Sequence, residues 1–288
     1  MCAAQAPSPL TLVDLSFLPL TKMIQWRLIE LPWRGAWMIS ASNSGRRRGI
    51  DRSVRGALVV CAKCEEGVLM RLTAIMAHPD DAEIWAGGTI CKHIERGDEA
   101  LIVYTAATED SPRGEEAKRG AAILGAQVAF VGLPDGQVRD FPEGCERVSA
   151  LLNGFAPDIL ITHWVDDFHA DHAATAVIVH RVLPFVIAHI GKAPRLWACD
   201  TYLSSGPRGL FVPDVHVDVT AQWSRKLAAI RAHLSQRPEA WVARTERQCG
   251  LHGHRYAPPE TQPERFYAEG FKRVVPLGFV APVAYLDT

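Results

Sequence analysis

The chain has 288 residues, of which 48% are apolar and 22% charged, with 22 glycines and 19 prolines. This composition is typical of a globular protein with a large buried core, and it excludes disorder, collagen and coiled coil. The net charge of −1 argues against nucleic acid as a partner, because binding to phosphates needs a basic surface. No apolar run approaches the roughly 20 residues that span a bilayer, so we expect no membrane span.

Residues 1–69 differ from the rest of the chain. They hold nine Lys or Arg against five Asp or Glu, and neither a helical nor a strand period is sustained through them. We predict that residues 1–69 are an extension, poorly ordered or not a domain, and that residues 70–288 form one domain. A mitochondrial presequence also has this basic, acid-poor composition. Seven scattered cysteines form no disulfide pattern, which favours a reducing, cytoplasmic location.

From residue 70 onward, short apolar runs alternate with helical patterns. We predict strands at 72–76, 101–104, 128–131, 159–161, 197–202 and 215–219. Helices are predicted at 82–96, 113–124, 142–153, 171–190 and 222–235. Gly97, Gly125 and Gly154 each follow a helix, the position at which a chain often leaves a helix with positive φ. The alternation predicts an α/β fold whose mostly parallel sheet is covered by helices on both faces.

Polar side chains cluster directly after the first and the fourth strand. Residues 77–83 read Ala-His-Pro-Asp-Asp-Ala-Glu, and residues 163–172 contain three histidines and three aspartates. In open parallel sheets ligands bind beyond the carboxyl ends of the strands, so two such clusters can meet there. Imidazole and carboxylate groups are ligands of catalytic zinc, which keeps one position open for water. The sequence therefore predicts a metal site built from both clusters.

These two clusters carry a resemblance to a known family. His78-Pro79-Asp80-Asp81 followed by Gly87-Gly88, and His169-Ala170-Asp171-His172 downstream, resemble the PIG-L/LmbE-like family of zinc-dependent N-acetylglucosamine deacetylases. Fragments such as Tyr267-Ala-Glu-Gly-Phe271 support the match, which covers about residues 70–275. The resemblance implies a Rossmann-like three-layer α/β fold.

The resemblance also implies a metal site and a general base. His78, Asp81 and His172 would bind Zn²⁺ or another divalent transition metal. Asp80 would act as the general base that takes a proton from the attacking water.

Four further residues receive roles from the same resemblance. His169 would stabilise the oxyanion or protonate the leaving amine, and Asp171 would hold the His169 ring in the correct tautomer. Arg113 and Asp135 would contact the substrate. Arg113 could equally pair with a helix carboxylate, and an Asp before Gly136 also suits a tight turn.

Several of these residues have a structural alternative. The His-Pro-Asp-Asp turn could cap the helix that follows it, because Asp is favoured at N-caps. His163 could line the pocket or be a buried structural residue. His252-Gly253-His254 could chelate a metal, but we interpret it as part of a glycine-rich loop. Loops at 110–115, 135–146, 204–213 and 250–262 are expected to determine specificity.

The leading hypothesis is a metal-dependent amidohydrolase that removes an N-acetyl or N-acyl group from a glucosamine-containing small molecule or glycoconjugate. A hydratase of a small unsaturated carboxylic acid is the alternative, because Trp85 stands where sugar deacetylases are expected to have a small or apolar residue. A non-catalytic metal- or sugar-binding module is a lesser alternative. The sequence leaves the aglycone, the acyl group, the metal and the oligomeric state open, including a homo-oligomer.

Overall fold

The computed structural model describes residues 24–30, 37–43, 69–139, 142–256 and 266–275, the first two ranges as backbone only. The chain divides into two compact units, Met1–Val68 and Leu69–Thr288. In the first unit, β1 (Ile24–Glu30) pairs antiparallel with β2 (Trp37–Asn43). The sequence does not predict these strands, because residues 1–69 show no sustained period. That this unit is an extension of the domain stays a prediction.

Seven strands of the second unit form one sheet in the order β10-β11-β7-β6-β3-β4-β5. Their bounds are β3 Arg71–Met76, β4 Glu99–Tyr104, β5 Gln127–Phe130, β6 Ile159–Thr162, β7 Arg195–Cys199, β10 Val215–Asp218 and β11 Ala268–Val274. Strands β5, β4, β3, β6 and β7 are parallel to one another, whereas β11 and β10 are antiparallel to their neighbours. This confirms the predicted α/β fold with a mostly parallel sheet.

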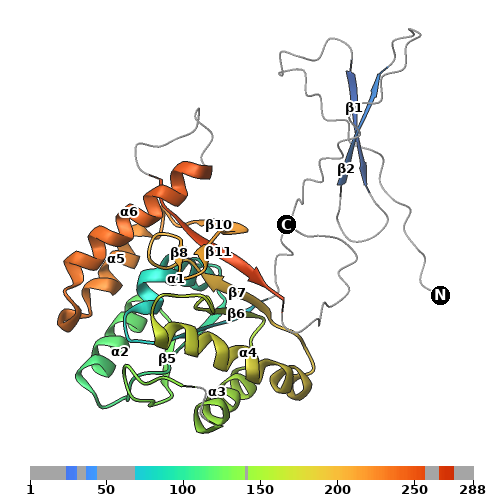
Figure 1. Cartoon of the computed structure of the whole chain (residues 1–288). Helices are drawn as coiled ribbons and strands as arrows, with labels where there is room; N and C mark the ends of the chain where they lie inside the picture. The colour runs from blue at the N-terminus through green and yellow to red at the C-terminus, as the bar shows by residue number, and fades with distance from the viewer. Residues whose placement is uncertain (1–23, 31–36, 44–68, 140–141, 257–265, 276–288) are drawn as a thin grey trace. The chain divides into compact units, whose positions relative to one another are not determined.

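Helices cover both faces of this sheet (Figure 1). Their bounds are α1 Asp81–Glu95, α2 Pro112–Leu124, α3 Pro142–Phe155, α4 Ala170–Ile190, α5 Trp223–Arg231 and α6 Pro238–Tyr256. Helix α1 packs against α2, α5 and α6, and α3 packs against α4. A 3₁₀ turn (Leu234–Gln236) follows α5, and a small hairpin joins β8 (Ser205–Gly206) to β9 (Gly209–Leu210).

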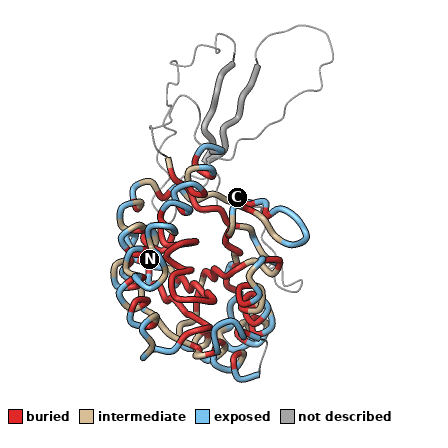
Figure 2. Tube along the Cα trace, turned by 60° about the vertical axis from the view of Figure 1, so that its left-hand side comes forward, coloured by how far each residue is buried: buried red, intermediate tan, exposed pale blue. Residues whose placement is uncertain are grey.

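The core lies in two layers, one on each face of the sheet. Because side chains alternate along a strand, Ala74 and Ile102 enter the cluster beneath α1, and Ile75 and Val103 enter the cluster beneath α3 and α4. Figure 2 shows the buried residues gathered in the strands and the inner helix faces. Strands buried on both faces are apolar throughout, which explains why short apolar runs marked them in the sequence.

Glycines follow the ends of two helices, as the sequence predicts. Gly97 and Gly125 have φ of 94° and 85° after α1 and α2. The expectation at Gly154 is wrong: α3 continues through it to Phe155, and Ala156 takes the positive φ of 51°. At Gly88, an added Cβ would lie 2.5 Å from the Cβ of Val219, so this glycine allows α1 to pack closely against the chain after β10.

The C-terminal third departs most from the prediction. The interpretation of residues 250–262 as a loop is wrong for residues 250–256, because α6 runs to Tyr256; residues 257–265 lie outside the described residues. Gly250 and Gly253 lower helix propensity in this stretch, so the sequence does not predict a helix here. An added Cβ at Gly253 would lie 2.1 Å from the carbonyl oxygen of Phe266, so close packing requires a glycine there.

One helix is long and apolar enough to cross a membrane by length and composition alone. Helix α4 has a mean hydropathy of 1.7 over its best 18 residues, so the expectation that no segment approaches this length is wrong here. The helix packs against α3 and contacts β3 and β6, and it carries Asp171 and His172 in its first turn. The core helix of a globular domain has this placement, and the finding is weak evidence for a membrane span.

Candidate metal and catalytic site

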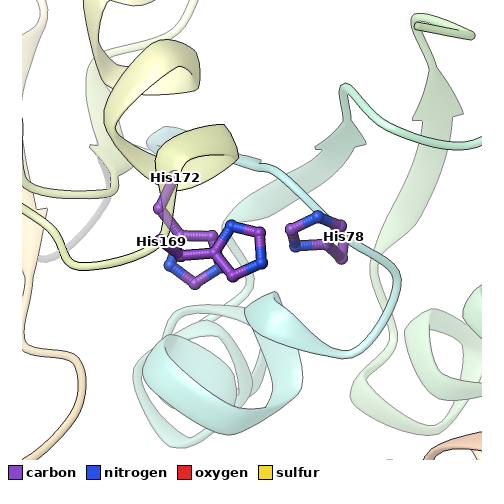
Figure 3. Close-up of side chains that lie close together, drawn as sticks. All are labelled: His78, His169 and His172. Atoms are coloured by element: carbon purple, nitrogen blue, oxygen red, sulfur yellow. The ribbon is translucent and has the colours of Figure 1, made fainter. Parts of the chain in front are cut away.

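The two predicted clusters meet at one edge of the sheet. Strands β3 and β6 are parallel neighbours, with Leu72 opposite Ile159, so the segments that follow them leave from the same edge. His78 comes from the loop after β3, whereas His169 and His172 come from the N-terminal turn of α4 (Figure 3). The ring centroids of His78 and His169 lie 4.7 Å apart, as do those of His169 and His172.

Asp81 lies between the other two predicted metal ligands. Oδ2 of Asp81 lies 3.3 Å from Nδ1 of His78 and 3.3 Å from Nε2 of His172. Ligand atoms held about 2.0 to 2.2 Å from a shared tetrahedral zinc ion lie roughly 3.3 to 3.6 Å from one another. The donor types, and the spacing of Asp81 from each of the two histidines, therefore fit a divalent transition metal.

Within the described residues, the groups of mutually close donor atoms combine these ligands differently, and none contains His78, Asp81 and His172 together. The donor atoms of His78, His169 and His172 lie within 4.8 Å of one another, and so do those of Asp81, His163 and His172. Only some of these side chains can bind one metal ion together. Their hydrogen-bond partners distinguish the possible ligands from their neighbours.

His78 is held between two carboxylates. Its Nδ1 faces Asp81, and its Nε2 lies 3.2 Å from Oδ2 of Asp171. The Asp171 carboxylate also accepts hydrogen bonds from the backbone N–H groups of Gly136 and Val138, at 2.7 and 3.0 Å. Its contact with His169 is through the backbone, whose N–H donates to Nδ1 of His169 at 3.2 Å. The carboxylate of Asp171 thus orients His78, where the resemblance assigned it to His169.

The other two predicted ligands also have a buried partner each. Nε1 of Trp85 donates to Oδ1 of Asp81 at 3.1 Å, which leaves Oδ2 toward the histidines. Nδ1 of His172 lies 3.2 Å from Oδ2 of Asp167, whose side chain is fully buried. A carboxylate on the far nitrogen of an imidazole is the usual way in which proteins orient a metal-binding histidine.

The site carries an excess of buried negative charge. Burial alone would lower the pKa of His172, but Asp81 and Asp167 more than offset this and raise it to about 10. Burial would raise the pKa of Asp81, yet His172 and His163 hold it well below its usual value. Carboxylates that draw protons onto neighbouring imidazoles in this way would also favour a cation between them.

Asp80 lies at the N-terminus of α1 without capping it through its side chain. It is the N-cap residue of α1 and has a φ of 113°, but its side chain makes no capping hydrogen bond. Such a left-handed conformation is unfavourable for a non-glycine residue and is found preferentially at functional sites. Burial and the adjacent Asp81 carboxylate raise the pKa of Asp80 to about 8, against the opposing effect of Arg113. The capping interpretation of this turn is therefore not supported.

Arg113 and Asp135 lie beside the metal ligands. Nη1 of Arg113 donates to Asp135 at 3.0 Å, and Nη2 donates to the carbonyl of Pro79 at 2.9 Å and lies 3.7 Å from Asp80. The Asp135 side chain is 58% exposed and lies 3.3 Å from Nε2 of His78. Both residues are thus at the site, as predicted, although their contact with a substrate remains a prediction.

Two other histidines lie in buried surroundings. His163 is buried, stacks on His172 at 3.8 Å, and accepts a hydrogen bond at Nε2 from the backbone of Ala77 at 2.9 Å. His252 does not lie in a loop: it is buried in α6, where its Nε2 lies 2.7 Å from Oδ2 of Asp200.

Sequence reasoning missed three neighbours of the ligands. Asp167 lies inside the second cluster, and a search for partners of His172 would have suggested it. In the sequence, Trp85 differs from the small or apolar residue expected at its position, but this does not predict its contact with Asp81. Tyr202 stacks on His172 with ring centroids 5.7 Å apart, and no signal in the sequence places it there.

Comparison with known proteins agrees with this geometry. Residues 73–183, which include the ligands and Asp80, match the family model PIG-L, described as GlcNAc-PI de-N-acetylase. This part of the chain thus carries a PIG-L family domain match.

The relatives that the chain matches include enzymes of two kinds. The 4-oxalmesaconate hydratase of Pseudomonas putida is 26% identical over 245 residues, which cover 80% of this chain and 93% of the relative. The 1D-myo-inositol 2-acetamido-2-deoxy-alpha-D-glucopyranoside deacetylase of Corynebacterium diphtheriae is 25% identical over 229 residues, covering 60% and 77%.

Solved structures share the fold described above. The 4-carboxy-2-hydroxymuconate hydratase of Pseudomonas putida superposes with a TM-score of 0.63 at 23% identity, covering 72% of this chain and 97% of that one. The N,N'-diacetylchitobiose deacetylase of Pyrococcus horikoshii gives 0.58 at 22% identity, covering 71% and 84%. The family thus contains both deacetylases and a hydratase on one fold.

Proposed function

We propose that this protein is a zinc-dependent hydrolase that removes an N-acetyl or N-acyl group from a glucosamine-containing small molecule or glycoconjugate. The observation that carries the proposal is the juxtaposition of a complete His-Asp-His ligand set with Asp80. This carboxylate is buried, makes no capping hydrogen bond, and adjoins the ligand Asp81. The relatives that deacetylate glucosamine conjugates support the same assignment.

The roles of the residues follow from their positions. A divalent metal held by His78, Asp81 and His172 would polarise an amide carbonyl and increase the acidity of water. A cation beside Asp80 would favour its ionised form, which would accept the proton of the attacking water. His169, half-buried beside the ligands, protonates the leaving amine or stabilises the oxyanion. Burial and the neighbouring His172 and His78 lower the pKa of His169, which makes its protonated form a stronger acid.

The proposal is tested by acetate release from a panel of N-acetylglucosaminides, with and without a chelator. We expect acetate release that the chelator abolishes and a stoichiometric divalent metal restores. Asp80→Asn should keep the metal and lose turnover by a factor of at least about 100, and His172→Ala should lose both. Absence of acetate and of metal, or an Asp80→Asn variant with normal kcat, would contradict the proposal.

A hydratase is the second candidate, because the Pseudomonas putida hydratase matches this chain over 93% of its own length. Such an enzyme adds water across a carbon–carbon double bond and releases no acetate. Product analysis of small unsaturated di- and tricarboxylic acids, run beside the glucosaminide panel, separates the two functions. The retention of Asp80 beside Asp81 favours hydrolysis.

We further propose a cytoplasmic location. Cys91, Cys199 and Cys249 are buried free thiols, and burial raises the pKa of each of them. Such thiols are compatible with a reducing compartment. Fractionation of cells that express the whole chain, including residues 1–69, tests the location.

A further inference from the structure

The chain makes an unusual turn directly after β7. Tyr202, Leu203 and Ser204 have φ of 47°, 60° and 62°, so three consecutive non-glycine residues are left-handed. The Cβ atom makes this conformation unfavourable, and it normally occurs at single residues. The surrounding structure must therefore hold the turn.

Several hydrogen bonds hold it. The backbone N–H of Leu203 donates to Oε1 of Gln248 at 3.3 Å, and the carbonyl of Ser204 accepts from Phe211 at 2.9 Å. The hydroxyl of Ser204 donates to the buried carboxylate of Asp200. These contacts stabilise the backbone without involving the side chains of Tyr202 and Leu203, of which Leu203 is 50% exposed.

The consequence of the turn is the position of the Tyr202 ring. The ring lies nearly parallel to that of His172, at 14°, and meets Trp85 edge-on with centroids 5.6 Å apart. Its hydroxyl makes no hydrogen bond within the described part of the chain. The turn thus places an unengaged phenol beside two residues of the metal site.

Hydrogen-bond donors near the ligands are otherwise largely engaged. The indole N–H of Trp85 donates to Asp81, and both Nη atoms of Arg113 donate, to Asp135 and to Pro79, although its buried Nε has no partner. The remaining neighbours are mostly carboxylates, which only accept when ionised. A phenol has a pKa of about 10 in water and so keeps its proton at neutral pH.

We propose that Tyr202 is a catalytic residue whose hydroxyl donates a hydrogen bond to the acyl oxygen of the substrate as negative charge develops on it. The inference rests on the proposed amide hydrolysis. Tyr202 keeps its proton throughout, so no further bond is made or broken. Because Tyr202 donates a hydrogen bond to this oxygen, His169 is available to protonate the leaving amine.

The test compares Tyr202→Phe with Leu203→Ala, a control in the same turn whose side chain is exposed. Kinetics on the N-acetylglucosaminide panel are measured together with the metal content and the melting temperature. We expect Tyr202→Phe to lower kcat about 100-fold, with KM, metal content and melting temperature unchanged, because loss of one oxyanion donor has this effect. Leu203→Ala should keep kcat within about twofold, since the hydroxyl stays in place.

Other outcomes overturn the inference in distinguishable ways. A kcat within twofold of wild type for Tyr202→Phe shows that the hydroxyl is not used. A loss of metal or of several degrees in melting temperature shows a structural role. If the wild-type protein turns over no member of the panel, the proposed function is wrong, and the inference about Tyr202 is wrong as well.

Discussion

Replacing Asp167 by Asn would test how the structure prepares His172 to bind a metal. The Asp167 side chain is fully buried, and it receives hydrogen bonds from the backbone N–H of His169 at 2.7 Å and from the hydroxyl of Thr201 at 2.5 Å. With its carboxylate 3.2 Å from Nδ1 of His172, the proton of a neutral ring belongs on Nδ1. Nε2 then presents a lone pair toward Asp81.

An Asn side chain would reverse this arrangement. If its oxygen keeps the bond from the His169 backbone, its NH₂ group faces Nδ1 of His172 and requires that nitrogen to accept. The ring proton then moves to Nε2, which can no longer bind a metal. The opposite amide orientation keeps the tautomer but leaves the His169 N–H facing another donor. Loss of such a partner typically lowers metal affinity about 10- to 100-fold, or about 1.4 to 2.8 kcal/mol.

The assay is a competition titration of the purified variant against a chromogenic chelator, with Zn²⁺ and with Co²⁺. Asp166→Asn is the matched control, because Asp166 precedes Asp167 in the same loop but pairs with Arg208 at 2.7 Å. We expect the control to bind metal within about twofold of wild type and Asp167→Asn to bind about 10-fold or more weakly. Equal affinities for Asp167→Asn and wild type would refute the tautomer reasoning.

Three further changes test the packing and the electrostatics of the domain. Gly88→Ala should cost about 1 to 3 kcal/mol in urea unfolding, because its Cβ would overlap Val219, and an unchanged midpoint would contradict the close packing. Gly154→Ala should instead stabilise by about 0.5 to 1 kcal/mol, since no atom lies within 4 Å of the added Cβ in α3. Burial would raise the pKa of Asp98, but the backbone N–H of Met70 and two basic neighbours lower it. A carboxyl group with a lowered pKa stabilises the fold above its unfolded pKa of about 4, and this stability is lost as the pH falls below it. The difference in melting temperature between wild type and Asp98→Asn should therefore shrink between pH 7 and pH 3, and a constant difference would contradict the lowered pKa.

The sequence by itself determined the features that depend on neighbouring residues. Apolar runs marked the buried strands, and glycines such as Gly97 and Gly125 marked the ends of helices, because only local backbone preferences and burial are involved. The sequence also predicted the placement of His78 and His172 after strands β3 and β6. In a parallel sheet, the common direction of the strands brings such loops to one edge.

Only the tertiary structure decided which side chains meet within that edge. The carboxylate of Asp171 contacts His78, its backbone contacts His169, and Asp167 supports His172, although local sequence favours no one of these pairings. Tyr202 reaches the site because contacts from α6 and from the chain after β9 hold a left-handed turn that no propensity predicts. Distances of 3 Å between side chains depend on the packing of whole elements, and sequence patterns carry no information at that precision.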